Sequence, residues 1–317
     1  MITFDEAVAC IRTANSFDDL TNDASSRQAY RRWARIVHPD AVSAAQRVTA
    51  TDAFAKLSIL YEKRAEPPNA AHQRAPDPVI ATRHGTYHLG RLFATGDVAE
   101  LHASGDALLK IPRDPADNDL MEAEADALRR LWNTGDPRFR PYVPRLIESF
   151  VHEDGQRRRR IVNVLERRRG MVSLPPAGQA DLGTVLWVWR RLLTVLGWAH
   201  RAGVVHGAVL ESHILIDPAR RGLVLVDWCY AGDRPRAIVK AREAAYPPEV
   251  LHDRIAGPAT DIFMAAGLMT RLMGPSAPVA LRRFADGCRY AAPRMRPQDA
   301  WALLAELDEL IPQRYRN

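Results

Sequence analysis

Apolar positions near the start of the chain recur with helical spacing in three separate stretches. Within each stretch they stand three or four residues apart, so they line one face of a helix. The three faces consist of Phe4, Ala7, Val8 and Ile11, of Tyr30, Trp33, Ala34 and Val37, and of Ala53, Phe54, Leu57, Leu60 and Tyr61. The pattern predicts three helices, and we expect the second and third to pack as an antiparallel hairpin.

This pattern stops between Glu66 and Pro78, where the sequence reads EPPNAAHQRAPDP. Proline and alanine dominate the stretch, and its apolar residues follow no period, which predicts an extended linker. We therefore expect a first domain at residues 1–66, a linker at residues 67–82 and a second domain at residues 83–317.

Beyond the linker, short apolar runs precede longer helical patterns. Runs of strand length fall within residues 87–113, 145–153 and 160–166, and helical spacing falls within residues 120–131. The most apolar segment, LGTVLWVWRRLLTVLGWAH, predicts a long buried helix. Two adjacent arginines stand at its centre, where they would be costly in a bilayer, so we expect no membrane span. The expected fold is multidomain, with an all-α first part and an α+β second part.

Composition and charge narrow the function classes only in part. The chain has 317 residues and an ordinary apolar fraction of 47%, which is typical of globular proteins. Its net charge of +6 leaves nucleic acid, acidic protein surfaces and membrane surfaces open as partners. Cys10, Cys229 and Cys288 are widely separated and form no CxxC pair, so neither a disulfide framework nor a zinc site is predicted. Because the N-terminus is acidic where a signal peptide would be basic, we expect a cytoplasmic protein.

A basic stripe lies opposite the apolar face of the second predicted helix. Arg27, Arg31 and Arg35 recur every four residues, and Pro39 is expected to end the helix because proline disfavours helical geometry in the residue before it. With the sequences AYRRWARIVHPD and FAKLSILYE, residues 1–66 resemble a J-domain, the module by which DnaJ-like cochaperones engage a DnaK-type chaperone.

The resemblance implies a DnaK-type chaperone as partner. In that family the basic helix meets an acidic surface of the chaperone, and a His-Pro-Asp tripeptide triggers ATP hydrolysis. By resemblance, the trigger is His38, Pro39 and Asp40, and the guiding charges are Arg27, Arg31, Arg32 and Arg35. The alternative is a chance helix stop beside a solvated arginine face. The glycine/phenylalanine-rich and cysteine-rich regions of some relatives are missing, so client binding is expected from elsewhere.

From about residue 83 to near the C-terminus, the order of elements resembles a protein kinase. Lys110 falls in a third strand, and Glu124 falls in a following helix where it would pair with that lysine. The motifs VVHGAVLESHILID, LVLVDWCYAG, YPPEV, TDIFMAAG and RMRPQDAWALL follow in kinase order. The resemblance implies a bilobal α+β fold, with an N-lobe at about residues 83–166 and a C-lobe at about residues 167–317.

The same resemblance implies that catalysis is lost. Phosphoryl transfer needs a carboxylate that receives the substrate proton and oxygen ligands for magnesium. Kinases place them in His-Arg-Asp, four residues, then Asn; here the matching positions hold His206, Gly207, Ala208 and then His213. Alanine cannot accept a proton, and imidazole suits magnesium poorly. Residues 227–249, the expected activation segment, contain no serine or threonine, so a conventional phosphorylation switch is not expected.

Other positions match the kinase pattern. Lys110, Glu124, Asp227 and the last glycine of the glycine-rich loop, Gly96, match nucleotide-binding positions, with Asp227 as a weak magnesium ligand. The matched structural positions are Leu128, His206 and Trp228, the pair Glu249 and Arg296, and Asp261. The nucleotide-binding set would hold ATP and Mg²⁺ weakly or would only stabilise the cleft between the lobes. His213 would fill the cleft or bind another metal.

The leading hypothesis is a J-domain cochaperone whose inactive kinase-like domain recruits an unknown client or partner protein, and which is not itself an enzyme. The alternative is an ATP-dependent kinase or other phosphotransferase with a rearranged site that recruits Asp217 or Glu211. A third possibility is nucleic-acid binding through the arginine runs 157–160 and 167–169, which otherwise read as solvated loops. No nucleic-acid-binding motif accompanies these runs, so nucleic acid is not the expected partner.

Overall fold

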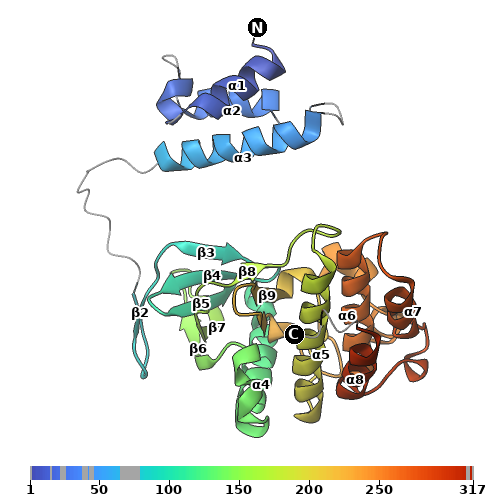
Figure 1. The fold of residues 1–317 in the computed structure, drawn as a ribbon. Helices are drawn as coiled ribbons and strands as arrows, with labels where there is room; N and C mark the ends of the chain where they lie inside the picture. The colour runs from blue at the N-terminus through green and yellow to red at the C-terminus, as the bar shows by residue number, and fades with distance from the viewer. Residues whose placement is uncertain are drawn as a thin grey trace. The chain divides into compact units, whose positions relative to one another are not determined.

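The chain divides into two units, Met1–Pro76 and Asp77–Asn317 (Figure 1). The computed structural model describes residues 2–14, 16–21, 26–37, 42, 46–64, 79–311 and 315. The described part of the first unit is helical, and the second unit combines sheets with helices. The coarse expectation of a mixed α and β chain is therefore confirmed.

Three helices and a short turn form the first unit, namely α1 (Phe4–Thr13), η1 (Phe17–Leu20), α2 (Ser26–Val37) and α3 (Arg47–Arg64). Thr3 caps α1, because the Glu6 backbone N–H bonds the Thr3 hydroxyl and the Glu6 carboxylate accepts from the Thr3 N–H at 2.8 Å. The apolar faces predicted from the sequence pack into one core around Ile11, Trp33 and Leu57. The three predicted helices are thus confirmed.

A five-stranded antiparallel sheet opens the main body of the second unit. Its strands are β3 (Leu92–Thr95), β4 (Ala99–Ser104), β5 (Ala107–Pro112), β6 (Leu146–Glu153) and β7 (Arg159–Glu166), in the order β3-β4-β5-β7-β6. Gly105, with a φ of 60°, makes the two-residue turn between β4 and β5 possible. Helix α4 (Asn118–Thr134) packs against β6 and β7. This arrangement brings α4 close to the residues of the central strands.

A hairpin of β1 (Val79–Ala81) and β2 (Thr86–His88) precedes this sheet. Ile80 is 5% exposed and packs in a small core with Leu109, Val162 and Val164. The Tyr87 hydroxyl donates to Glu148 Oε1 at 2.5 Å, and burial together with this carboxylate raises the pKa of Tyr87 to about 12. Residues 79–82, which we expected in the linker, thus belong to the second unit.

Helices dominate the rest of the second unit and lie beside the sheet (Figure 1). They are α5 (Leu182–Arg201), α6 (Pro258–Met273), α7 (Val279–Gly287) and α8 (Ala300–Leu310). Strands β8 (Val172–Ser173), β9 (Ile214–Asp217) and β10 (Gly222–Leu225) form a small sheet in the order β10-β9-β8. The short helical turns are η4 (Pro115–Asp117), η5 (Pro137–Tyr142), η6 (Glu211–His213), η7 (Trp228–Tyr230), η8 (Lys240–Ala245), η9 (Glu249–Asp253) and η10 (Pro293–Met295).

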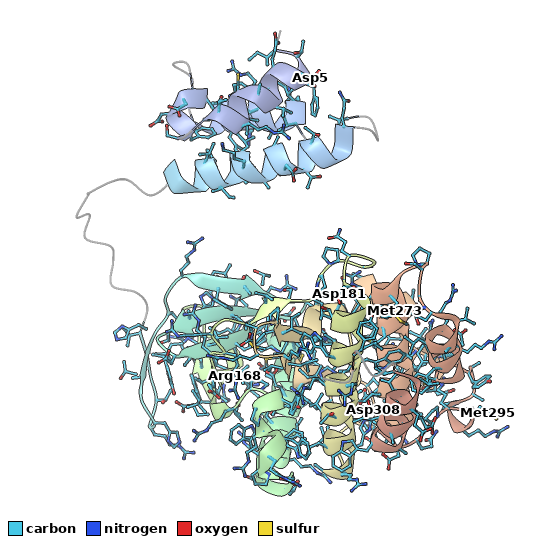
Figure 2. The ribbon with its side chains drawn as sticks, viewed as in Figure 1. Asp5, Arg168, Asp181, Met273, Met295 and Asp308 are labelled. Atoms are coloured by element: carbon cyan, nitrogen blue, oxygen red, sulfur yellow. The ribbon has the colours of Figure 1, made fainter. Side chains whose placement is uncertain are left out.

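Helix α5 is the long buried helix that its apolar sequence predicted. Asp181 caps its start by accepting from the Thr184 N–H at 3.0 Å (Figure 2). Arg190, near its centre, donates to the carboxylate of Asp308 on α8 at 2.7 Å, which explains how a charged residue is accommodated there. No helix in the described ranges has the length and apolar character needed to cross a membrane.

The arginine run at residues 157–160 is not a uniformly solvated loop. Arg160 lies in β7 and is only 8% exposed. Its Nε donates to the carbonyl of Pro112 at 2.9 Å, and it also pairs with Asp154. The pKa of Asp154 is lowered, although burial opposes this. The largest cause is the hydrogen bond from the Arg158 backbone, and the Gln156 backbone and the side chains of Arg158 and Arg160 add to it. Arg160 therefore ties β7 to the end of β5.

Candidate functional site

Three charged side chains from distant parts of the second unit meet at one point. Lys110 on β5 is 2% exposed, and its Nζ lies 2.8 Å from Glu124 Oε1 on α4 and 2.6 Å from Asp227 Oδ1. Asp227 adopts a left-handed backbone with φ 60°, a conformation that aspartate tolerates better than most residues. The predicted pair of Lys110 and Glu124 is present, and Asp227 completes a charge triad with it.

Asn163 supports this triad and was not predicted. It is fully buried on β7, opposite Lys110 in the register of the two strands. Its amide nitrogen donates to Glu124 Oε2 at 3.0 Å and to the carbonyl of Met121 at 2.9 Å. A single amide in the otherwise apolar strand RIVNVLE was the signal that could have identified it, because buried polar groups need hydrogen-bond partners.

Lys110 and Asp227 hold each other in their charged forms. Burial alone would lower the pKa of Lys110, but the negative charges around it, chiefly Asp227, outweigh burial and raise that pKa well above its ordinary value. Burial would likewise raise the pKa of Asp227, but the charge of Lys110 lowers it to about 2. The ammonium and this carboxylate therefore remain ionised throughout the neutral range, and each neutralises the other.

A loop held by Asp261 lies next to the triad. Asp261 is completely buried on α6, and its carboxylate accepts from the backbone N–H groups of His206 and Gly207, both at 2.8 Å. Gly207 has a φ of 76°, and an added Cβ would lie 2.6 Å from the carbonyl oxygen of Tyr230. The loop thus has a backbone that only glycine fits at this position.

Ala208 and His213 follow in this loop and place no carboxylate beside the triad. Ala208 is fully buried, and its carbonyl accepts a hydrogen bond from His213 Nδ1 at 2.8 Å. The other ring nitrogen of His213 lies 3.6 Å from Asp227 Oδ2 and 3.8 Å from Asp97 Oδ2. Burial would lower the pKa of His213, but Asp97, Asp227 and the Ala208 carbonyl raise it. His213 therefore faces Asp227 with a pKa raised above its ordinary value.

Asp97 was also missed by sequence reasoning. It lies in the turn between β3 and β4, directly after Gly96, and its carboxylate reaches across to His213. Gly96 is where it was predicted, in the same turn, and an added Cβ there would come within 3.3 Å of the Ala99 carbonyl. An acidic residue next to the expected nucleotide-binding glycine was the available signal, because it opposes the approach of phosphate.

His206 is a neutral histidine, and each of its two ring nitrogens makes a hydrogen bond to the backbone. Its Nε2 donates to the carbonyl of Val226 at 2.9 Å, and its Nδ1 accepts from the Ala208 N–H at 3.2 Å. The ring meets that of Trp228 edge to face at 4.7 Å. Burial lowers the pKa of His206 to about 4. Trp228 and the buried Leu128 belong to the main core, and the His206 ring packs against it through Trp228.

The free energy of unfolding of the second unit is expected to fall as the pH drops from 6.5 towards 4, because unfolded His206 binds a proton that the folded protein excludes. This single group accounts for about 3 kcal/mol over that interval. His213 acts in the opposite sense: its raised pKa adds stability below 6.5, and that stability is lost as the pH rises through the raised value. Urea unfolding of the wild type and of His206→Gln across this range measures the contribution of His206.

The control for this measurement is His252→Gln, which changes an exposed histidine. The His206→Gln variant is expected to show a shallower pH dependence than both the wild type and this control. Parallel curves for all three proteins would contradict a neutral, proton-excluding His206.

The charge triad lines a cleft of about 860 Å³. The other ionisable side chains that line it are Asp97, Glu166, His213, Arg113, Arg168 and Arg242. The apolar lining includes Leu101, Leu108, Leu165, Met171 and Leu215. Asp217 and Glu211, the carboxylates considered as substitutes for the missing base, do not line it. The cleft thus combines an apolar surface with ionisable groups, of which Lys110, Glu124 and Asp227 are paired with each other.

The predicted pair of Glu249 and Arg296 is also present. It lies outside the loop of residues 206–213, which we call the cleft loop. Arg296 is 3% exposed and donates to both Glu249 oxygens, at 2.7 and 2.9 Å. Removing either partner would leave a buried charge without compensation, so the pair is a structural element. No group of three or more His, Cys, Asp or Glu side chains in the described residues is arranged to hold a metal ion.

The candidate residues of the first unit are described only in part. Arg31 and Arg35 are exposed on the side of α2 away from the buried Trp33 and Val37, and the exposed Arg32 places its guanidinium 5.7 Å from the centroid of the Trp33 ring. The side chain of Arg27 and all of His38, Pro39 and Asp40 lie outside the described residues. The basic face of this helix is therefore present where the sequence placed it.

Comparisons with known proteins add no family to this picture. No protein-family model matches the chain, and no curated protein matches it.

Proposed function

We propose that the chain is a cytoplasmic J-domain cochaperone, in which the first unit stimulates the ATPase of a DnaK-type chaperone. The second unit would be a catalytically inactive kinase-like domain that recruits a client or partner protein. The proposal rests on the sequence resemblances of the two parts, and several features of the structure support it.

The proposal that the second unit is catalytically inactive rests on one observation, the residue types in the loop beside the charge triad. A protein kinase pairs a strand lysine with a helix glutamate and places an aspartate in its catalytic loop to receive the substrate proton. Here Lys110 and Glu124 are paired, but Ala208 stands at the position of that aspartate and is buried. A methyl group cannot accept a proton, so the residue at this position would not supply the base that the reaction requires.

The residues present also fit a magnesium nucleotide poorly. Lys110 already bonds two carboxylates, which leaves its charge neutralised before any phosphate arrives. His213 approaches Asp227 where a kinase would offer an amide oxygen to the metal. Asp97 adds a carboxylate to the same side of the cleft. These charges support a structural role for the triad, and weak ATP binding remains the alternative proposal.

The first unit supports the cochaperone role through its exposed charges. Three arginines on α2 are exposed, while the opposite face of the helix packs into the core of the unit. Such a rigid basic face would steer the chain to an acidic surface and raise the rate of association. The tripeptide that follows the helix would then act on the chaperone.

A DnaK-type chaperone is expected to hydrolyse ATP faster in steady state when the full chain is added, and Asp40→Asn is expected to abolish that stimulation. The carboxylate of Asp40 is the charged group of the proposed trigger, and the amide replaces it at nearly the same size. The assay measures phosphate release at increasing concentrations of the chain.

Asp52→Asn is the matched control, because it makes the same chemical change at an exposed position of α3. It should leave stimulation intact. Arg31→Gln/Arg35→Gln should raise the concentration needed for half-maximal stimulation, and the effect should weaken at high salt. Absence of stimulation by the wild type, or full stimulation by Asp40→Asn, would refute the cochaperone role.

A further inference from the structure

One stripe of α6 in the second unit carries exposed positive charge. Phe263, Gly267 and Arg271 recur every four residues, so they lie along the same face of the helix. The guanidinium of Arg289 lies 4.9 Å from the ring centroid of Phe263. It also lies against Gly267, where an added Cβ would come within 3.3 Å of Arg289 Nε. Arg289 is therefore one helical turn away from Arg271.

Hydrogen bonds from Arg296 hold the backbone of the loop that carries Arg289. The Nε of buried Arg296 donates to the Tyr290 carbonyl at 2.6 Å, and its Nη2 donates to the Ala291 carbonyl at 2.8 Å. The charge of Arg296 is itself neutralised by Glu249. The backbone that presents Arg289 is thus fixed before any partner arrives, which reduces the entropy lost on binding.

Arg242 in η8 adds a third charge to this region. It faces Glu211 at 3.5 Å, a pair in which both side chains are largely exposed. Burial lowers the pKa of Arg271, Glu211 opposes this, and Arg289 and Arg242 lower it further. Arg271 therefore lies close enough to both Arg289 and Arg242 for their positive charges to act on it. Among the described residues, no carboxylate forms an ion pair with Arg271 or Arg289.

Exposed apolar side chains adjoin these charges. Tyr290 directly follows Arg289 and is 53% exposed, and Met295 next to Arg296 is 61% exposed and projects from the second unit (Figure 2). Arginine, tyrosine and methionine are the residue types enriched at protein–protein interfaces, where arginine binds carboxylates in a bidentate manner. We call Arg242, Arg271, Arg289 and Tyr290 the basic surface.

We propose that the basic surface binds an acidic segment of a partner protein, whose carboxylates pair with Arg271 and Arg289 while an apolar side chain packs on Tyr290. Charge complementarity selects this occupant, because Arg271 and Arg289 form no ion pair within the described part of the chain, and the backbone next to Arg289 is fixed by Arg296. The inference deepens the proposed function, since it gives the chemistry of the protein that the second unit would recruit. The binding itself does not depend on the first unit acting on a chaperone.

The test measures the fluorescence anisotropy of a labelled oligoglutamate peptide with one tyrosine as the full chain is added. We expect Arg271→Gln/Arg289→Gln to weaken binding about tenfold or more, with the loss shrinking as salt is raised. The matched control is Arg129→Gln/Arg220→Gln, which removes the same charge from exposed positions on α4 and in the β9–β10 turn. This control should bind as the wild type does.

Two outcomes would overturn the proposal. The first is an equal loss in both double variants, or no binding by the wild type, which would mean that the basic surface has no special role. The second is tighter binding of a single-stranded oligonucleotide of equal charge that the same substitutions abolish, which would identify a nucleic-acid surface. Chaperone ATPase stimulation by Arg271→Gln/Arg289→Gln, measured in parallel, should be unchanged, so a failure of the cochaperone role is seen separately.

Discussion

Replacing Lys110 with methionine is expected to lower the free energy of unfolding of the second unit by about 3–5 kcal/mol. The ammonium is nearly inaccessible and bonds both Glu124 and Asp227, at 2.8 and 2.6 Å. Without it, completely buried Glu124 would retain, among the side chains that the structure describes, the Asn163 amide as its hydrogen-bond partner. Urea unfolding followed by tryptophan fluorescence reports on this unit, because every tryptophan except Trp33 belongs to it.

Two further variants separate the loss of charge balance from the loss of a side chain. Lys110→Met/Glu124→Gln removes the uncompensated buried charge and is expected to be more stable than Lys110→Met alone. Arg138→Met breaks an ion pair with Asp136 of similar length, 2.7 Å, at the surface, and is expected to change stability little. If Lys110→Met were as mild as this control, the lysine would be held for a ligand rather than for the fold.

Local patterns in the sequence predicted most of the helical structure. The apolar residues of α1, α2 and α3 were predicted from their spacing, and the same residues form the core of the first unit. The long helix α5 was predicted from its apolar run, although the partner of Arg190 was not. These elements could be predicted because helix formation depends on residues within one or two turns of each other.

Contacts between distant segments were harder to predict. Ile80 stands in a polar, proline-containing stretch, and only its burial against Leu109 and Val164 makes residues 79–82 part of the second unit. Arg160 reads as one of four consecutive arginines, yet strand β7 directs it to the Pro112 carbonyl. In both cases the deciding partner lies tens of residues away, and a spacing rule carries no information about it.

The candidate site was predicted only where the resemblance supplied a pattern. Lys110, Glu124 and Asp227 were expected to be close, and they are. Asn163 and Asp97 were not expected, because neither belongs to a motif, and their roles follow from the register of β5 with β7 and from the position of the β3–β4 turn. These two residues change the chemistry of the site, since one fixes Glu124 and the other adds negative charge.

The triple variant Gly207→Arg/Ala208→Asp/His213→Asn introduces the residues that protein kinases carry at the positions matched by resemblance. It is expected to destabilise the second unit without producing phosphotransfer. A side chain at position 207 would adopt a φ near 76° and would place its Cβ 2.6 Å from the Tyr230 carbonyl. Strain of this kind costs about 1–2 kcal/mol, and relieving such a contact costs about 1–3 kcal/mol more. A carboxylate at the fully buried position 208 would add a desolvation cost. Unfolding measurements and incubation with labelled ATP test the two parts of this prediction.

Gly105→Arg is the matched control for the strain, because Gly105 has a φ of 60° with no atom within 4 Å of an added Cβ. It is expected to lower the free energy of unfolding by about 1–2 kcal/mol, which is the cost of the left-handed backbone without a steric clash. The difference between Gly207→Arg and Gly105→Arg therefore measures how closely the cleft loop packs on Tyr230. If the triple variant kept wild-type stability and transferred phosphate at a measurable rate, the loop would be a catalytic loop that lacks only its side chains. That result would contradict the proposal that the second unit is a catalytically inactive domain that recruits a partner protein.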